Sequence, residues 1–358
     1  MLHYLIDTFE EHYLDPQKED QELIAATLAK ELEKFADPDF LQQNIIGEAL
    51  FEWDLRAIHE GCLDIMQPFI ASQSYIPLFF CSILRDLGCD PKEYIKASIL
   101  IEYCYYSLGV IDYFDFHQAF TPHEQDLKRF AELTQLRYAA QYFIQYPQYL
   151  VIQNAFGLSK SENLSLHKLY ATIGVAAGCG RGVFQKWANN YFIDMSEPHY
   201  LQNCIHTLNN FFIFPVLTAA LFAEIPLSVR NELQNAFAVL TLFSKLRLEK
   251  KYYLKQADYT VPDHYTDLFS ILAFPGMALL HEDIQIDQSR FSKDRFPSMP
   301  AMYRDIYRTL ENTGAEKAIA AITLLEKELF DTFLTSMSKA NVLSDTVSRI
   351  CTCYKMER

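Results

Sequence analysis

The chain has few glycines, no cysteine pairs at metal-binding spacing and no long uninterrupted hydrophobic run. Only 11 of its 358 residues are glycine, and none lies between Gly182 and Gly276. That stretch is too long to consist of short strands joined by tight turns. The eight cysteines are scattered without C-x-x-C spacing, which argues against a zinc site and against a disulfide framework. We therefore expect an all-α protein in a reducing, cytoplasmic compartment.

Basic residues are also too few for a nucleic-acid-binding surface. The sequence has 31 lysines and arginines against 46 aspartates and glutamates, a formal net charge of −15. Such a chain is not attracted to phosphate backbones or anionic membranes. The N-terminus carries acids where a signal peptide carries basic residues, and no apolar run reaches the roughly 18 residues of a membrane span. We expect a soluble protein with no nucleic-acid partner and no transmembrane segment.

Apolar residues instead recur at helical spacing through most of the chain. The expected helices cover residues 20–35, 40–66, 74–87, 91–118, 123–156, 163–192, 197–222, 227–256, 264–281, 300–312 and 315–340. Half of all residues are hydrophobic, enough for one large core, and no internal repeat or flexible linker divides the chain. We expect residues 1–358 to form a single helical bundle, with a polar loop over Glu282–Pro300.

Two carboxylates stand three residues apart inside an otherwise apolar segment. Ile95–Phe120 is apolar on nearly every side, which predicts a central buried helix. Asp112 and Asp115 share one face of it. A buried aspartate is costly unless it is hydrogen-bonded, paired with a cation or bound to a metal. The pair therefore predicts a partner close by.

The segments around this pair resemble, in their order, those of the class I isoprenoid synthases, the trans-prenyltransferases and terpene synthases. In that family a helix ending in S-L-x-x-D-D-x-x-D holds magnesium, and here Ile111 replaces the first aspartate while Asp112 and Asp115 keep their places. A glycine-rich helix of the G-x-x-G-G-Q type follows, matched by Gly174–Gln185 with the glutamine displaced. The resemblance covers roughly residues 75–280. It implies a bundle around a central apolar cavity, with Mg²⁺ at the aspartate pair.

Two later motifs of the family are altered more strongly. The Y-L-x-x-I-x-x-K-T helix is matched by Tyr200–Asn210, which lacks the lysine that contacts the diphosphate. The second acidic motif, F-Q-x-x-D-D-x-x-D, is represented by Phe243–Lys251, with basic or apolar residues where acids belong. The resemblance implies that a prenyl diphosphate or other isoprenoid is bound by residues on several helices. They are Tyr105, Tyr106, Gln185, Asn209, Asn210, Arg247 and Lys251.

Each of these residues also has a structural interpretation. The glycine cluster is equally compatible with close helix packing, and the aromatic residues with an ordinary core. Arg247 and Lys251 are neighbours on one helical face that is ordinarily solvated, but in the resembled fold this face looks toward Asp112 and Asp115. A salt bridge from these two basic residues to the aspartates is therefore an alternative to magnesium.

Three functions follow from these alternatives. The first is an enzyme acting on a prenyl diphosphate, either a terpene cyclase or an altered prenyltransferase with a partial magnesium site. The second is a non-catalytic subunit or isoprenoid-binding protein of the same fold, and the third is an unrelated helical scaffold. The sequence identifies no catalytic residue. The resemblance further implies a homodimer or heterodimer through helices that flank residues 123–156.

Overall fold

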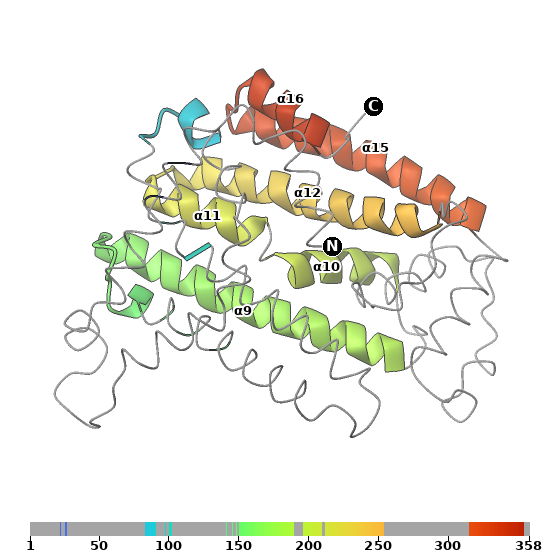
Figure 1. The fold of residues 1–358 in the computed structure, drawn as a ribbon, viewed down its shortest axis with the longest axis horizontal. Coiled ribbons are helices and arrows are strands. Elements are labelled where there is room, and N and C mark those ends of the chain that lie inside the picture. The colour runs from blue at the N-terminus through green and yellow to red at the C-terminus, as the bar shows by residue number, and fades with distance from the viewer. Residues whose placement is uncertain are drawn as a thin grey trace.

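The described part of the chain consists of helices joined by turns and short loops, with no strand in it. The computed structural model describes residues 83–90, 150–189, 196–209, 212–253 and 315–353, together with the single residues 22, 26, 97, 100, 101, 141, 145 and 148. Its continuous helices are α9 (Lys160–Asn189), α10 (Glu197–Leu208), α11 (Ile213–Phe222), α12 (Leu227–Tyr253), α15 (Ala315–Lys339) and α16 (Ser344–Cys353) (Figure 1). The all-α fold class expected from the sequence is confirmed.

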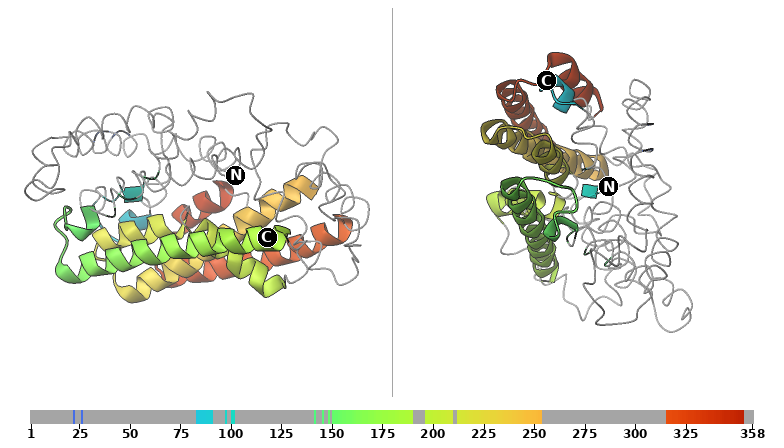
Figure 2. Two further views of the ribbon diagram at one scale, coloured as in Figure 1. Left: turned by 90° about the horizontal axis from the view of Figure 1, so that it is seen from below. Right: turned by 90° about the vertical axis from the view of Figure 1, so that its left-hand side faces the viewer.

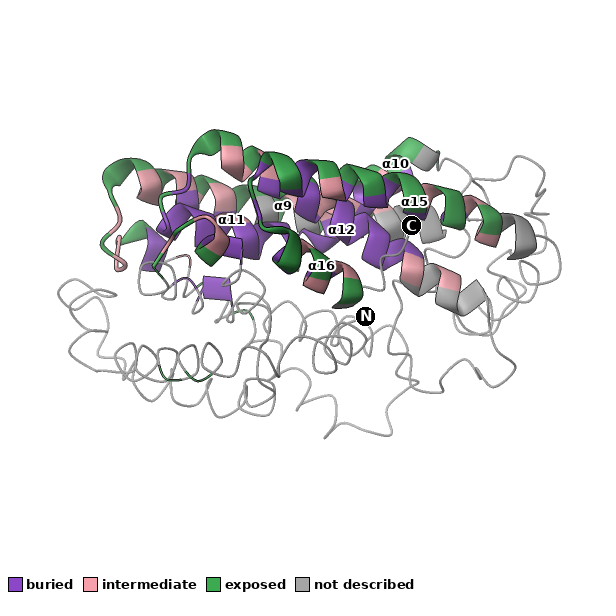
Figure 3. Cartoon of the chain, turned by 90° about the horizontal axis from the view of Figure 1, so that it is seen from above, coloured by how far each residue is buried: buried purple, intermediate pink, exposed green. Residues whose placement is uncertain are grey.

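Helix α12 occupies the middle of the described bundle. It packs against α15 on one side and against α10 and α11 on the other, and these two shorter helices also contact α9. Figures 1 and 2 show the resulting succession, in which α10 and α11 lie between α9 and α12. The side chains of Leu233, Phe237 and Leu240 on α12 are fully buried, and the burial colouring in Figure 3 follows this helix through the interior. Burial of these apolar side chains is the main stabilising contribution here.

The ends of several helices follow the sequence signals closely. Ser159 and Glu162 form a reciprocal capping box at the start of α9: the Ser159 N–H donates to Glu162 Oε2 at 3.1 Å, and the Glu162 N–H donates to Ser159 Oγ at 3.3 Å. These bonds satisfy backbone donors that a helix leaves unpaired at its first turn. α9 therefore begins three residues earlier than expected. α12 and α15 begin at the expected residues.

The single helix expected over 197–222 is wrong, because the chain breaks between α10 and α11. The two parts are bent by 53°, and the Phe214 N–H donates to the Asn209 carbonyl across the break at 2.8 Å. Pro215 explains the interruption. Proline has no N–H and its ring collides with the carbonyl four residues earlier, so it is tolerated in the first turn of α11 but not inside one long helix.

Two further boundaries differ from the sequence expectation. The helix expected over 123–156 ends by Ile152, and residues 153–156 form a turn in which Asn154 has a left-handed φ of 52°. Helix α16 was not expected at all. Its first turn is anchored from a distance, since the Leu343 N–H donates to Asp86 Oδ2 at 3.1 Å. A contact between residues so far apart in the chain cannot be predicted from the local sequence.

Among the described helices, none alone has the length and apolar character of a membrane span. One bent pair, Pro198–Leu208 with Ile213–Phe222, meets both criteria when the two helices are taken together.

Candidate ligand-binding helices

Most of the residues expected at a ligand site fall outside the described part of the chain. This holds for Asp112, Asp115, Tyr105, Tyr106 and Asn210. For Gln185 on α9 and Lys251 on α12 the structure describes only the helical backbone. Asn209 and Arg247 are described in full, so the site is built here from these two residues and their surroundings.

The glycine-rich part of α9 makes a close contact with α10 at one glycine. A Cβ atom on Gly180 would lie 2.5 Å from Thr207 Oγ1 and 3.0 Å from the Thr207 backbone nitrogen. The buried side chain of Asn203 strengthens the contact, because its Nδ2 donates to the Gly180 carbonyl at 3.0 Å. By contrast, no described residue lies within 4 Å of the corresponding positions at Gly174, Gly178 and Gly182. Close helix packing therefore accounts for Gly180 alone among these glycines.

Asn209 follows directly after α10 and is buried, with 5% of its surface exposed. Within the part of the chain that the structure describes, its Oδ1 atom has no hydrogen-bond partner, and the same is true of the buried Thr207 Oγ1. A buried acceptor without a partner costs roughly 1–3 kcal/mol. Asn209 thus carries an unsatisfied polar atom at the point where the chain breaks before α11, which suits a residue that contacts a ligand.

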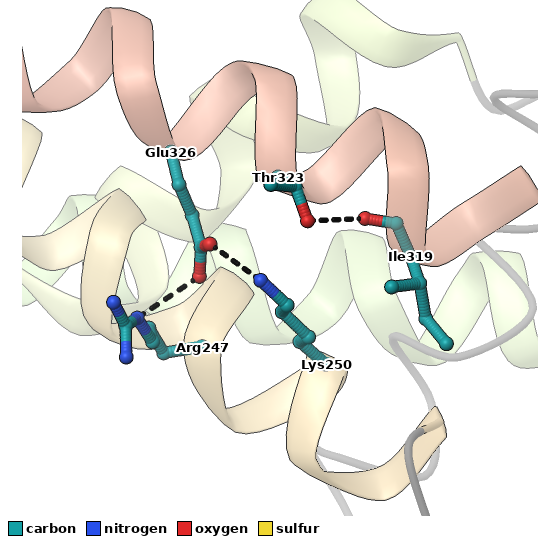
Figure 4. A network of polar contacts seen from close by, with 5 residues as sticks. All are labelled: Arg247, Lys250, Ile319, Thr323 and Glu326. Atoms are coloured by element: carbon teal, nitrogen blue, oxygen red, sulfur yellow. Dashed lines mark hydrogen bonds and ion pairs between the residues drawn. The ribbon is translucent and has the colours of Figure 1, made fainter. Parts of the chain in front are cut away.

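On the other side of α12, Arg247 and Lys250 converge on one carboxylate of α15. Arg247 Nε lies 3.1 Å from Glu326 Oε1, and Lys250 Nζ donates to Glu326 Oε2 at 2.9 Å. The side chain of Glu326 is 8% exposed, against 27% for Arg247 and 20% for Lys250. Figure 4 shows Glu326 pointing from α15 into the space between the two basic side chains. A second contact orients Arg247, whose guanidinium carbon lies 5.1 Å from the centre of the Phe243 ring.

The sequence matches no protein-family model and no curated protein. Solved structures, in contrast, resemble the chain over nearly its whole length. A geranylgeranyl pyrophosphate synthase from Lactobacillus brevis superposes with a TM-score of 0.64 at 15% identity, covering 96% of this chain and 97% of that one. The chain has the fold of the prenyl diphosphate synthases.

Two other structures with this fold were solved with bound ligands. A geranylgeranyl pyrophosphate synthase from Corynebacterium glutamicum, complexed with isoprenyl diphosphate and magnesium, superposes with a TM-score of 0.63 at 12% identity and covers 93% of this chain and 96% of its own. A polyprenyl synthase from Caulobacter crescentus, complexed with calcium and isoprenyl diphosphate, gives 0.62 at 12% identity, with 96% and 98% covered. The resemblance stated from the sequence motifs is thus matched by the fold.

The segment Phe243–Lys251 of α12 stands in the place of the second acidic motif of the resembled family. A divalent cation prefers carboxylate and water oxygens. In this segment Arg247 and Lys250 carry positive charges instead. The carboxylate of Glu326 contacts both of them. These side chains do not fit a magnesium ion at this segment. In the described ranges as a whole, no three His, Cys, Asp or Glu side chains come together as a metal-binding group.

Sequence reasoning missed Glu326, which lies outside the region that resembles the family. Figure 4 shows its carboxylate between Arg247 and Lys250. The available signal was its place within a helix whose neighbours Leu329, Phe330 and Phe333 are buried: an acid on the same apolar face requires a cation. Lys250 was named in the altered motif but was not selected as a ligand-binding residue. Its position three residues after Arg247 puts both on one helical face.

The thiol of Cys351 on α16 is not activated as a nucleophile. Burial raises the pKa of the Cys351 thiol to about 11, so the thiol is protonated at neutral pH and is a poor nucleophile.

Proposed function

We propose that this chain binds a prenyl diphosphate and acts on it as an altered prenyltransferase or a terpene cyclase. Magnesium would be held only by Asp112 and Asp115, while side-chain cations take its place on α12. The observation that carries the proposal is the pairing of Arg247 and Lys250 with Glu326 at the second-motif segment of a chain with the prenyl diphosphate synthase fold.

The proposed chemistry follows from the charge of the ligand. A prenyl diphosphate carries about three negative charges, and its ionisation requires positive groups that stabilise the leaving diphosphate. Bound magnesium would supply part of that stabilisation at the first acidic pair. Arg247 and Lys250 would supply part of it as fixed cations, which need no carboxylates to hold them. Asn209, with its unsatisfied buried amide oxygen, would help to orient the ligand.

The segment just before the acidic pair bears on the size of the ligand. In the resembled family, bulky residues one helical turn before the first acidic motif close the cavity floor. Tyr105 and Tyr106 occupy that place here, so we propose that short isoprenoids are preferred. Turnover or binding of a long polyprenyl chain that is unaffected by Tyr105→Ala and Tyr106→Ala would contradict this preference.

The magnesium part of the proposal is tested by thermal unfolding with farnesyl diphosphate. Ligand that binds only the folded state stabilises it by mass action, by about 2.7 kcal/mol at a hundredfold excess over Kd. We expect this stabilisation to require Mg²⁺ and to be lost in Asp112→Asn. The exposed Asp345 on α16 provides a matched control, since Asp345→Asn makes the same charge change away from the site. Stabilisation that is independent of Mg²⁺ and survives in Asp112→Asn would overturn the partial magnesium site.

A non-catalytic subunit is the second candidate, and an exposed surface of α9 favours it. Leu164 and Val175 are 54% and 67% exposed, and Gly178 and Gly182 on the same helix have open space beside them. Apolar and small residues exposed on one helix are typical of a surface that another chain covers. Because α9 follows directly on residues 123–156, this surface fits the expected homodimer or heterodimer. Sedimentation of a monomer at micromolar concentration would contradict that association.

A further inference from the structure

The end of α10 carries a buried acceptor oxygen to which no described residue donates a hydrogen bond. Asn209 directly follows this helix and keeps helical backbone geometry, with φ −58° and ψ −26°. Only 5% of the residue is exposed, and its Oδ1 atom is the unpaired acceptor. A buried amide oxygen of this kind is stabilised when a ligand brings a hydrogen-bond donor or a cation to it.

The direction of Asn209 distinguishes it from Thr207, whose buried Oγ1 is also unpaired among the described residues. Thr207 lies against α9, because its Oγ1 would be 2.5 Å from a Cβ atom on Gly180. At 3.6 residues per turn, Asn209 points about 200° away from Thr207 around the helix axis. The Asn209 side chain is therefore directed away from α9, toward the side of α10 on which α12 lies (Figure 1).

The helix end itself adds negative character at this place. The C-terminal end of a helix carries a partial negative charge and carbonyl groups that have no partner inside the helix, and both favour cations. The break after α10 is held in place, because the Asn209 carbonyl accepts the Phe214 N–H at 2.8 Å. A buried acceptor at the negative end of a helix favours a cation over an anion.

The Asn209 amide oxygen suits a metal-bound water better than it suits a diphosphate oxygen. Diphosphate oxygens are acceptors, like the amide oxygen, whereas a water bound to Mg²⁺ is a donor, and Mg²⁺ usually keeps several of its waters in a protein site. We propose that Asn209 Oδ1 accepts a hydrogen bond from a water of the magnesium ion that binds with the diphosphate. The proposal deepens the proposed function, on which it rests for the presence of that ion.

Opposite charges at this position should shift the magnesium requirement in opposite directions. Asn209→Asp keeps an acceptor and adds a negative charge, so it should lower the Mg²⁺ concentration that the complex needs. Asn209→Lys brings back the lysine that the resembled family has in this neighbourhood, and it should raise that concentration. Each shift should be about tenfold or more, because a unit charge close to a divalent ion has an effect of this size even at the dielectric constant of water.

The experiment follows thermal unfolding of the full chain at a fixed excess of farnesyl diphosphate while Mg²⁺ is titrated. The measured quantity is the Mg²⁺ concentration that gives half of the rise in melting temperature. Asn235→Asp and Asn235→Lys are the matched controls, because Asn235 is exposed on α12. They make the same charge changes at the surface and should shift the half-maximal concentration by less than about twofold.

A third variant keeps the test decisive if a charged side chain at this buried position prevents folding. Asn209→Leu removes the amide at nearly constant volume and should raise the half-maximal Mg²⁺ concentration about fivefold, the equivalent of one hydrogen bond. The melting temperature of each variant without ligand reports whether it is folded. An unchanged Mg²⁺ requirement in Asn209→Leu would overturn the proposal.

The direction of the two charge effects separates this inference from its alternatives. A purely structural role of Asn209 would make both charged variants need more Mg²⁺, and a contact with the diphosphate itself would reverse the two signs. Either result would overturn the inference and leave the proposed function in place, since the wild type would still require Mg²⁺ and Asp112. Stabilisation of the wild type by farnesyl diphosphate without Mg²⁺ would overturn both.

Discussion

The α9–α10 contact and the α12–α15 contact both bury polar groups between two helices, but they do so by opposite means. At α9–α10 the groups are neutral, and the helices meet because Gly180 has no side chain. At α12–α15 the groups are charged, and long side chains bridge the helices through Glu326. The neutral contact brings α9 and α10 close together and leaves no room for a Cβ atom on Gly180. The charged contact bridges a longer distance, because both basic side chains reach from α12 to one carboxylate on α15.

The largest loss of stability is expected from Gly180→Ala at the α9–α10 contact. The added Cβ would collide with Thr207 at 2.5 Å and with its backbone nitrogen at 3.0 Å, and overpacking of this kind costs about 1–3 kcal/mol. Gly178→Ala and Gly182→Ala are matched controls in open space, where alanine should stabilise the helix by roughly 0.5–1 kcal/mol. Chemical denaturation of the three variants gives the free energies of unfolding. Equal effects at all three positions would contradict the close contact.

A smaller loss of stability is expected from Glu326→Gln. The substitution removes the charged carboxylate that contacts both Arg247 and Lys250. Because these two side chains are 27% and 20% exposed, solvent reduces the cost to about 1–2 kcal/mol, below the range for a fully buried pair. Glu328→Gln on the exposed side of α15 should change the unfolding free energy by less than about 0.5 kcal/mol. A double-mutant cycle with Arg247→Gln measures the coupling. A coupling energy of zero would show that the pair contributes nothing to stability.

The smallest effect is expected from Asn203→Ala on α10. The variant removes the hydrogen bond from Asn203 Nδ2 to the Gly180 carbonyl, which is worth about 1 kcal/mol for a neutral pair. The exposed Gln202 is the control, and Gln202→Ala should be close to neutral. Combined with Gly180→Ala, the loss from Asn203→Ala should be less than additive, because the first substitution already separates the helices. Full additivity would mean that the two sites do not form one contact.

Local sequence signals were sufficient for the helical class and for several helix starts. The low glycine content excluded a strand-rich fold, and α12 and α15 begin where the apolar pattern begins. The order of the altered motifs also indicated a fold that the superpositions with prenyl diphosphate synthases bear out. These features depend on residues close together in sequence or on the order of segments along the chain. Both are visible without coordinates.

The contact partners of particular residues and one helix break could not be predicted from local signals in the same way. Arg247 was selected as ligand-binding, with a bridge to Asp112 and Asp115 as the alternative. The structure places it against Glu326, 79 residues further along the chain, while its relation to the two aspartates stays a prediction. The break at Asn209 was missed because the apolar pattern continues on both sides of it, although Pro215 was a usable signal.

The sequence by itself determined that this protein is helical and acidic, and that it departs from both acidic motifs of the family it resembles. Those properties follow from composition and from spacing along one chain. Only the tertiary structure decided which glycine lies against a neighbouring helix and which acid meets the basic residues of α12. Gly174, Gly178, Gly180 and Gly182 look alike in sequence, but the neighbouring helix approaches only Gly180 within 4 Å. Steric contacts and Coulomb interactions depend on distance through space, which the sequence does not record.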